Sequence, residues 1–409
     1  MYDVIIIGSG IAGLYAAYTI KRLSPSTTFL ILEKQRKQGI GGRAGNEMFC
    51  GTEIVTGAGI GRRKKDKLLH LLLKELSLKT TEFKIEPNYS RTIISQISDI
   101  PGIMDELKKK LDQMDNNGKS ETFKTFAKNI LGEEEYDRFL ITSGYTDYEN
   151  EDVHDVLYHY GMDDNSTKYK GFHVGWKELV LKMAETIGSE HFRFSKNVVA
   201  LSKTISQTFQ IYTGSGGTFY SAKKVIVATT ISGIRMLLPD FHIYKEIEGQ
   251  PFVRVYGKFD KTSMTIISRF VKGTTIVPGP LQKIIPIDTD KGIYMIAYSD
   301  NKHALHLKSH LENTVQNRNY FCLAIEQSLG IQRDSLKLTT MKHFFWDIGT
   351  HYYKPLDTRL YKSRAAFINQ AQHPDKDVLV VGEVVSFQQG WTEGALESVH
   401  LSITKKWLA

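Results

Sequence analysis

Glycine residues near the start of the chain have the types and the spacing of a dinucleotide site. Gly8, Gly10 and Gly13 form the pattern G-x-G-x-x-G. The first glycine permits a tight turn, the second lets a pyrophosphate approach the backbone, and the third lets a helix pack closely on a strand. Glu33 follows at about the 20-residue spacing of an acid that binds a ribose hydroxyl. A glycine-rich turn in another kind of α/β protein is the alternative, but it leaves Glu33 unexplained.

The segments around these residues have the patterns needed to position them. The apolar, β-branched run Asp3–Ile7 predicts a buried strand, and Phe29–Leu32 predicts a second strand that ends at Glu33. A helix is expected over Leu14–Leu23, and its N-terminus would offer backbone N–H groups and a positive dipole end to phosphates. Further candidate contacts to the dinucleotide lie beside these elements: Ile11, Ala12 and Lys34.

Two more glycine-rich stretches follow. In Gly39–Arg43, glycines that allow close backbone approach precede an arginine, so Gly42 and Arg43 suit a second contact to the pyrophosphate. The next stretch consists of small residues that could run under a flat ring: Gly57, Ala58, Gly59 and Ile60.

The rest of the chain predicts an α/β fold that is interrupted by other elements. Helical spacing dominates residues 62–170, and strands with one amphipathic helix return over residues 171–228. Strands joined by turns follow, and Met264–Phe270 is expected to be one of them. One long helix is expected over His306–Leu329, and a last helix over Glu393–Leu408.

This order of elements predicts two discontinuous domains. Residues 1–61, 171–240 and 341–409 would form the nucleotide-binding domain. Residues 62–170 and 241–340 would form an α+β substrate-binding domain that contains a mixed sheet and a helical insertion.

The composition is that of an ordinary globular protein. The 409 residues include 41% hydrophobic and 24% charged side chains, and no apolar run approaches the roughly 18 residues of a membrane span. We expect no membrane anchor, and no leader before the strand that begins at Asp3. Cys50 and Cys322 have neither metal-binding nor redox spacing, so we expect a reducing compartment, the cytoplasm.

The formal net charge of +8 includes one short basic run, Arg62–Lys67. Cations at the start of a helix oppose its dipole, so this run indicates either an anionic ligand or partner, or a solvated helix start that happens to be basic. A single run without interleaved aromatic residues does not support nucleic-acid binding.

Two other clusters could bind a metal only in principle. His303, His306 and His310 have no carboxylate or cysteine at ligand spacing, so a solvated helix face is expected. The acidic run Asp147–Asp155 lacks the glycine of a calcium loop. This run is expected to be a solvated loop or, alternatively, an acidic entrance that attracts ammonium substrates. We therefore predict no metal site.

Near its C-terminus the chain contains Gly382-Glu383 and, further on, Gly390-Trp391-Thr392-Glu393-Gly394-Ala395. With Gly8–Gly13, Gly41-Gly42-Arg43 and the middle-chain strands, these motifs resemble the flavin-containing amine oxidase family. The resemblance extends over essentially the whole chain and keeps the same order. It implies a Rossmann-like FAD-binding domain, and FAD rather than NAD as the cofactor.

The resemblance also implies how FAD would be held. Glu33 would bind the adenosine ribose, Val198 would bind the adenine through its backbone, and Arg43 and Glu383 would meet the pyrophosphate and ribityl region. The backbone N–H of Thr392 would face the flavin N1–O2 edge, where a helix N-terminus stabilises the negative charge of reduced flavin. Two further contacts are implied: Gly382 and Ala395.

On the substrate side, Trp346–Tyr353 resembles the family segment that approaches the flavin. Tyr352 and Trp391 would then be the aromatic walls that hold an amine beside the ring and orient its C–H bond. The alternative is that both are ordinary core aromatic residues.

The sequence differs from the family pattern at three positions. His351 stands where several members attach flavin to a cysteine, so a cysteinyl link is excluded and non-covalent binding is expected. Arg254 is the nearest match to a lysine that holds a water near flavin N5. It would replace that lysine, pair with a substrate carboxylate, or face solvent as an ordinary strand residue. Val399 replaces the last glycine of the C-terminal motif, which is a packing change.

The function implied by the resemblance is FAD-dependent oxidation of a small-molecule amine or amino acid. Hydride would pass to the flavin, and O₂ would be the acceptor, which gives an imine or aldehyde and H₂O₂. One alternative is a desaturase or a mutase of the same fold. The other is a redox-inactive, FAD-stabilised binding protein that uses Arg62–Lys67 as its contact.

Overall fold

Strand β1 (Tyr2–Ile7) lies inside the larger of two main sheets. In the computed structural model, which describes residues 1–114, 118–162, 169–214 and 219–409, this sheet has the order β10-β11-β12-β1-β2-β9, and β18 also pairs with β12. β1 is parallel to β2 and β12, and β12 is parallel to β18. The other strands of this sheet are β2 (Phe29–Leu32), β9 (Phe192–Arg193), β10 (Val198–Lys203), β11 (Phe209–Thr213), β12 (Phe219–Val227) and β18 (Val378–Val380).

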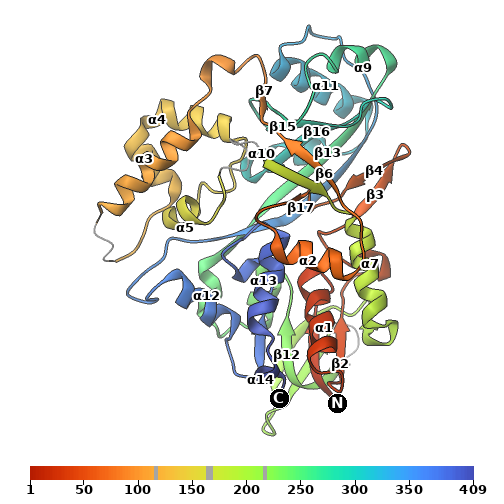
Figure 1. Ribbon diagram of the computed structural model, residues 1–409, viewed down its shortest axis with the longest axis vertical. Helices are drawn as coiled ribbons and strands as arrows, with labels where there is room; N and C mark the ends of the chain where they lie inside the picture. The colour runs from red at the N-terminus through yellow and green to blue at the C-terminus, as the bar shows by residue number, and fades with distance from the viewer. Residues whose placement is uncertain (115–117, 163–168, 215–218) are drawn as a thin grey trace.

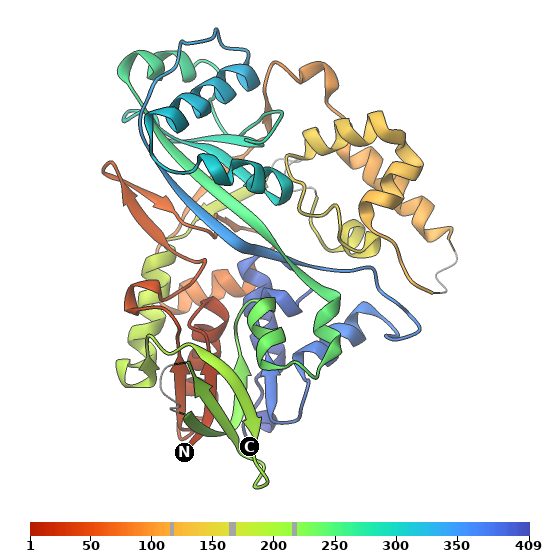
Figure 2. The ribbon, with the colours of Figure 1, turned by 180° about the vertical axis from the view of Figure 1, so that it is seen from behind.

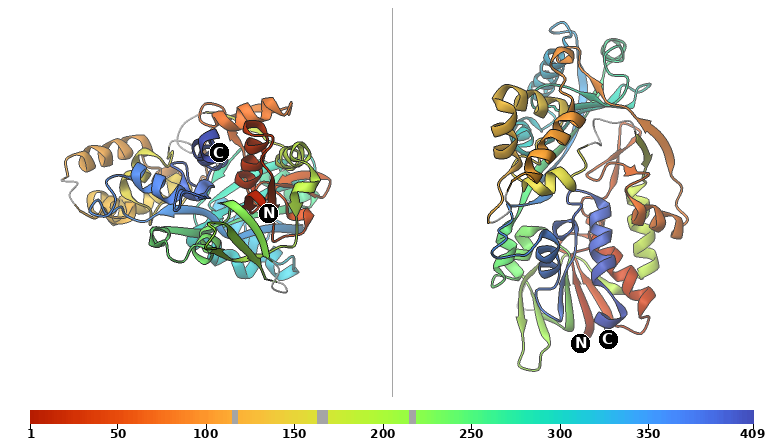
Figure 3. Two further views of the ribbon diagram at one scale, coloured as in Figure 1. Left: turned by 90° about the horizontal axis from the view of Figure 1, so that it is seen from below. Right: turned by 60° about the vertical axis from the view of Figure 1, so that its left-hand side comes forward.

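Both faces of the larger sheet are covered, which explains why β1 is apolar at successive positions. Val4 and Ile6 point into a core on one face, and Ile5 and Ile7 point into a core on the other. The helices of the first face are α1 (Ile11–Leu23), α2 (Lys67–Glu75), α7 (Trp176–Ile187) and α13 (Thr392–Ser402). Those of the second face are α8 (Ile231–Leu237) and α12 (Arg364–Gln372). Both chain termini lie at one end of this sheet (Figures 1 and 3).

The second sheet has the order β17-β13-β16-β15-β14-β7. Its long strands β13 (Ile247–Phe259) and β17 (Leu338–Tyr353) run diagonally across the molecule (Figure 2). Their ends near the larger sheet belong to that sheet's core, and their other ends belong to a core of the second sheet. The division into two domains therefore stays a prediction. The remaining elements here are β7 (Asn88–Tyr89), β14 (Thr275–Ile276), β15 (Lys283–Asp288), β16 (Ile293–Asp300), α9 (Lys261–Ile267), α10 (Asn301–Leu307) and α11 (Val315–Leu329).

A helical lobe lies beside the second sheet (Figure 1). It consists of α3 (Ile100–Asp112), α4 (Phe123–Ser143) and α5 (Val153–Tyr158), which share a core of their own. The backbone of Gly132 (φ 78°) kinks α4 within its length. The region before and after this lobe also contains strands that the sequence did not predict: β3 (Asn46–Phe49), β4 (Thr52–Val55), β5 (Gly61–Arg62), β6 (Thr81–Ile85) and β8 (Tyr169–His173).

Three sequence predictions of secondary structure are wrong. The strand expected over Met264–Phe270 is the helix α9, which begins where the Asp260 side chain accepts the backbone N–H of Ser263. The helix expected over His306–Leu329 is divided into α10 and α11, and α11 begins after Thr314, which caps it. The last helix also divides, because α13 ends at Ser402 and α14 (Lys405–Leu408) follows. Within the described ranges, no helix has the length and apolar character to cross a bilayer.

Candidate active site

The glycine turn between β1 and α1 has the shape that the sequence predicted. Gly8 has φ +105°, and a Cβ atom there would clash with the Ala228 carbonyl oxygen. A Cβ at Gly13 would clash with the Gly8 carbonyl oxygen. At Gly10, by contrast, a Cβ would have no heavy atom within 4 Å. The turn thus needs Gly8 and Gly13 for its own packing, whereas Gly10 leaves the backbone open to a ligand.

Helix α1 begins at Ile11, three residues before the predicted start. The backbone N–H groups of Ile11, Ala12 and Gly13 therefore lie in its first turn, where no helical carbonyl can accept them. These N–H groups and the dipole of a 13-residue helix are available to an anion beside Gly10.

Glu33 is buried directly beside this turn. Its Oε2 atom accepts hydrogen bonds from the backbone N–H and the hydroxyl of Ser9, each at 2.8 Å, and its Oε1 atom accepts the N–H of Gln35. A carboxylate can accept about four hydrogen bonds, so capacity remains for a ligand hydroxyl. The backbone N–H of Lys196 donates to the Glu33 carbonyl, and this brings the start of β10, Val198, close to Glu33. The side chain of Lys34 is exposed.

The second glycine stretch lies against the first. Gly41 bridges to Gly10, and a Cβ at Gly42 would lie 3.6 Å from the Gly10 Cα. The Arg43 Nη1 atom donates to Glu383 Oε1 at 2.7 Å and to the Gly349 carbonyl at 2.6 Å. Residues that are about 340 positions apart in the chain, and that the sequence assigned to one cofactor, thus meet in the structure.

Glu383 is the centre of a buried polar network at the end of β18. The Nδ1 atom of His351 donates to Glu383 Oε1 at 2.6 Å, and the Nε2 atom accepts the N–H of Ile231 at 3.1 Å, so we assign the proton to Nδ1. Burial alone would raise the pKa of the Glu383 carboxyl, but its interactions with His351 and Arg43 lower that pKa to about 2. Glu383 therefore stays ionised in the site, and Arg43, His351 and Gly390 hold its carboxylate in place.

Arg254 points from β13 toward the small residues that follow Gly57, and its side chain is only 4% exposed. Its Nε atom donates to the Gly57 carbonyl at 2.9 Å, and a Cβ at Gly59 would lie 3.0 Å from Nη2. The guanidinium also lies 4.4 Å above the Tyr298 ring. The alternative that Arg254 faces solvent is therefore wrong. Among the described residues, no carboxylate lies within 4.0 Å of this cation.

The small residues at 57–60 have packing reasons of their own. A Cβ at Gly57 would clash with the backbone carbonyl of Arg43, and the Ala58 N–H donates to that same carbonyl at 2.8 Å. The Gly59 carbonyl accepts the indole N–H of Trp176 at 2.9 Å. The segment therefore runs tightly between Arg43 and Arg254, and Ile60 at its end is half-buried.

Trp391 directly precedes α13, so the Thr392 N–H lies in the first turn of that helix, and Ala395 is buried further along it. The guanidinium of Arg62 lies 3.6 Å from the centroid of the Trp391 ring. Arg62 is buried and pairs with Asp66, with Nη2 at 2.7 Å from Oδ1. The expectation of a solvated basic run is therefore wrong at its first residue.

The acid that stabilises the start of α2 comes from α13. Both carboxylate oxygens of Glu393 accept backbone N–H groups in the first turn of α2, from Leu68 at 2.8 Å and from Leu69 at 2.9 Å. This negative charge offsets the cations that precede α2, because an anion at a helix N-terminus is favourable. The anionic partner suggested by the basic run is thus, at least at α2, part of the same chain.

The two expected aromatic walls lie on different elements. Tyr352 is half-buried on β17, opposite Glu248 on β13, and burial raises the pKa of its hydroxyl. Trp391 lies at the start of α13. Within the part of the chain that the structure describes, the two rings make no direct contact with each other.

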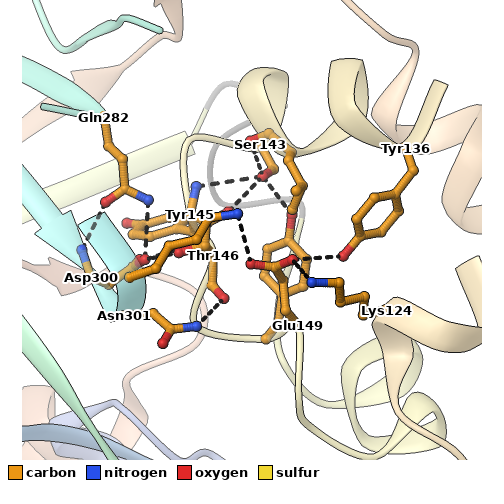
Figure 4. Close-up of polar contacts among 12 residues, drawn as sticks. Lys124, Tyr136, Ser143, Tyr145, Thr146, Glu149, Gln282, Asp300 and Asn301 are labelled. Atoms are coloured by element: carbon orange, nitrogen blue, oxygen red, sulfur yellow. Dashed lines mark hydrogen bonds and ion pairs between the residues drawn. The ribbon is translucent and has the colours of Figure 1, made fainter. Parts of the chain in front are cut away.

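The acidic run Asp147–Asp155 connects the helical lobe to the second sheet. The Asp147 carbonyl accepts the side-chain N–H of Gln250 on β13, and Glu149 contacts residues of α4 (Figure 4). Glu149 is buried, accepts the Tyr136 hydroxyl at 3.3 Å and lies 3.4 Å from Lys124. Asp300 at the end of β16 accepts both the N–H and the hydroxyl of Thr146. The prediction of a solvated loop is therefore wrong, and buried carboxylates do not form an open acidic entrance either.

Comparison with known sequences gives the family. The sequence model of the flavin containing amine oxidoreductases matches residues 11–263, which is more than half of the chain. The chain belongs to this family. No curated protein matches its sequence. A similar solved structure is that of cyclohexylamine oxidase from Brevibacterium oxydans IH-35A, with a TM-score of 0.75, 17% identity, and coverage of 98% of this chain and 97% of that chain.

Membership in the flavin containing amine oxidoreductases confirms the resemblance seen in the sequence and indicates a flavin cofactor. The structural similarity confirms the Rossmann-like α/β fold class. The residues present fit a flavin dinucleotide, because Gly10 leaves room at the helix start and Glu33 keeps acceptor capacity beside it. Binding of a flavin dinucleotide thus explains why the open backbone at Gly10 lies next to the Glu33 carboxylate.

Sequence reasoning missed several residues of this oxidoreductase site. Ser9 lies between two predicted glycines, and nothing in its type indicated that it binds Glu33. Arg62 and Asp66 are four residues apart, a spacing that could have indicated their ion pair. Tyr298 lies on β16, and only the pairing of β16 with β13 places it beside Arg254.

Proposed function

We propose that this protein is an FAD-dependent amine oxidase. FAD, when bound, would take a hydride from the carbon next to the substrate nitrogen and pass two electrons to O₂, so that amine and O₂ become imine and H₂O₂. Water would then hydrolyse the imine to an aldehyde or ketone and ammonia or an amine. Family membership supports the amine chemistry. The observation that carries the proposal is the meeting of the Gly10 turn, Glu33 and the Arg43–Glu383 pair at the ends of parallel strands.

We assign the cofactor contacts along that line of residues. The N–H groups at the start of α1, with Gly8, Gly10 and Gly42, would hold the pyrophosphate. Glu33 would bind the adenosine ribose, and the backbone of Val198 the adenine. Arg43 and Glu383 would hold the ribityl region, where the low pKa of Glu383 keeps it an acceptor for hydroxyl groups.

The N-terminus of α13 would support the reduced cofactor. In this proposal the Thr392 N–H faces the flavin N1–O2 edge, and the dipole of the 11-residue helix α13 stabilises negative charge there. Gly394 lets α13 pack closely on the segment that precedes it, since a Cβ there would clash with the Gln388 carbonyl oxygen. The helix end is thus fixed before any ligand binds, which is the condition for electrostatic preorganisation.

We propose non-covalent binding of the flavin. Each ring nitrogen of His351 has a partner, Glu383 at Nδ1 and the N–H of Ile231 at Nε2. A covalent link through either nitrogen would break one of these buried hydrogen bonds.

The two free cysteines suit the reducing compartment, the cytoplasm, that we propose for the protein.

For the substrate we propose Tyr352 and Trp391 as walls and Arg254 as the charged group. Because Arg62 already covers one face of Trp391, only the opposite face can contact a substrate. Arg254 would either stabilise the negative charge that develops when O₂ is reduced or pair with a substrate carboxylate. Its missing carboxylate partner among the described residues supports both roles, since a buried cation without a counter-charge favours an anion.

The test is the visible spectrum of the purified protein, followed by anaerobic mixing with monoamines, polyamines and amino acids. The proposal expects a yellow protein that one of these classes bleaches and that O₂ restores with release of H₂O₂. Bleaching without reoxidation by O₂ would indicate another acceptor, as in a desaturase. A yellow protein that no amine bleaches would contradict the amine oxidase proposal.

A further inference from the structure

Outside the candidate active site, α5 and the residue that follows it bring three metal-ligand side chains together. One nitrogen each of His154 and His159 and one carboxylate oxygen of Asp155 all lie within 4.8 Å of one another. We propose that these residues bind a divalent first-row transition ion of the zinc type. This inference does not depend on the flavin chemistry.

The imidazole nitrogens of this cluster are not used by the rest of the described protein. Neither imidazole ring, of His154 or of His159, forms a hydrogen bond with any residue in the described ranges. Asp155 is only 3% exposed, and its Oδ2 atom accepts the Nε–H of Arg364 at 2.6 Å. Its Oδ1 atom accepts no hydrogen bond from the residues that the structure describes. This oxygen therefore remains available as a ligand for a cation.

The two imidazoles are close to the separation that a shared ion requires. Their ring centroids are 5.9 Å apart. With Zn–N bonds of about 2.0–2.1 Å and tetrahedral angles, two ligated imidazole centroids would lie about 5.2 Å apart. The His159 ring packs 4.7 Å from the Phe387 ring, whereas His154 is exposed. Rotation of His154 alone can therefore close most of the difference.

Asp155 is also held in place by a side chain outside the cluster. Ligating carboxylates are usually held by another hydrogen bond, and Arg364 supplies that bond to Asp155. The same guanidinium lies 3.7 Å from Asp152, so two buried carboxylates face one positive charge. Arg364 alone does not balance both carboxylates, so a cation bound at the cluster would be favourable.

The donor set indicates which ion would bind. Imidazole nitrogens with one carboxylate suit zinc, cobalt or nickel, whereas calcium and magnesium require mostly oxygen ligands. Three protein ligands leave at least one coordination position for water. The other histidine cluster differs, because His306 binds the Tyr320 hydroxyl at 3.2 Å and His310 stacks on the Tyr320 ring at 3.8 Å.

The test uses the full-length protein as purified, freed of metal with a chelator. Titration with Zn²⁺ by calorimetry, and with Co²⁺ by its visible absorption bands, should give one ion per chain. His154→Ala and His159→Ala should each weaken Zn²⁺ binding at least tenfold, because each removes one of three ligands. His306→Ala is the matched control and should leave the affinity unchanged.

The exposed position of His154 makes its substitution safe for folding, and far-ultraviolet circular dichroism checks this. The proposal is overturned if Zn²⁺ shows no saturable binding with a stoichiometry of one. It is equally overturned if His306→Ala weakens binding as much as His154→Ala does, or if Ca²⁺ competes with Zn²⁺ at equal concentration.

Discussion

Replacing Glu383 by glutamine removes one charge from a buried network while it keeps the side-chain size. In the structure, Glu383 Oε1 accepts bonds from Arg43 and His351, and Oε2 accepts the N–H of Gly390 at 3.2 Å. A glutamine oxygen can replace one carboxylate oxygen, but its NH₂ group would face a donor. The substitution therefore loses the charge interaction with Arg43 and one acceptor.

The expected loss follows from the pKa. Burial opposes ionisation of Glu383, yet its partners lower the pKa from 4.5 to about 2. At about 1.4 kcal/mol per pKa unit, this difference contributes about 3 kcal/mol to the free energy of unfolding at pH 7. Since the folded-state pKa is depressed, the contribution is complete above about pH 4.5 and is lost as the pH falls toward 2. Linkage predicts that only a minor part of it is lost between pH 7 and pH 4.

Urea unfolding of wild type and Glu383→Gln at both pH values, with FAD in excess, measures the difference. Glu75→Gln is the matched control, because Glu75 pairs with Arg22 at 2.8 Å but both side chains are exposed. Such a surface pair is worth about 0–1 kcal/mol. The reasoning would be refuted if Glu383→Gln lowered the free energy of unfolding no more than Glu75→Gln does. It would also be refuted if the difference between wild type and Glu383→Gln were larger at pH 4 than at pH 7.

Three further predictions concern the proposed cofactor site. Glu33→Ala should weaken FAD binding roughly tenfold or more in a fluorescence titration, because a hydrogen bond to a charged group is worth about 1.5–3 kcal/mol; unchanged affinity would remove Glu33 from the site. Acid precipitation should release the yellow colour into the supernatant, and colour that stays in the pellet only while His351 is present would reverse the non-covalent assignment. In stopped flow, Arg254→Met should slow either reoxidation by O₂ or reduction by substrate about 10²-fold. The first result supports the oxygen role and the second the carboxylate role, whereas less than about a twofold change in both makes Arg254 structural.

The helices, strands and turns that are determined by residues within the same segment were predicted from the sequence. The turn at Gly8–Gly13 and the strands beside it follow from glycine spacing and apolar runs, and the structure contains them. The amphipathic helix expected within residues 171–228 is α7, whose apolar positions repeat with helical period. The strand expected over Met264–Phe270 failed because β-branched residues there outweighed the capping Asp260, which lies just before the run.

The interactions that depend on tertiary contacts could not be predicted. Glu393 was part of a recognised motif, but its carboxylate caps a helix about 325 residues earlier in the chain. Arg62 was assigned to a basic run by its neighbours, yet it is buried on the Trp391 ring. In both cases one element supplies a charge and a distant element supplies its partner, and neither segment alone contains that information.

The position of Arg254 depends both on the local strand pattern and on tertiary contacts. On β13, Val253 and Val255 point into the core of the second sheet, so the alternation of a strand places Arg254 and Tyr256 on its other face. There the Tyr256 hydroxyl donates to the Val55 carbonyl at 2.7 Å, and Arg254 Nε donates to the Gly57 carbonyl at 2.9 Å. Two successive side chains on one face of β13 thus bind alternate carbonyls of one segment, and this match fixes the guanidinium beside Gly59. A buried cation held this firmly, without a carboxylate partner among the described residues, is costly unless an anion completes the site. That cost is the physical reason to expect a ligand or a developing negative charge next to Arg254.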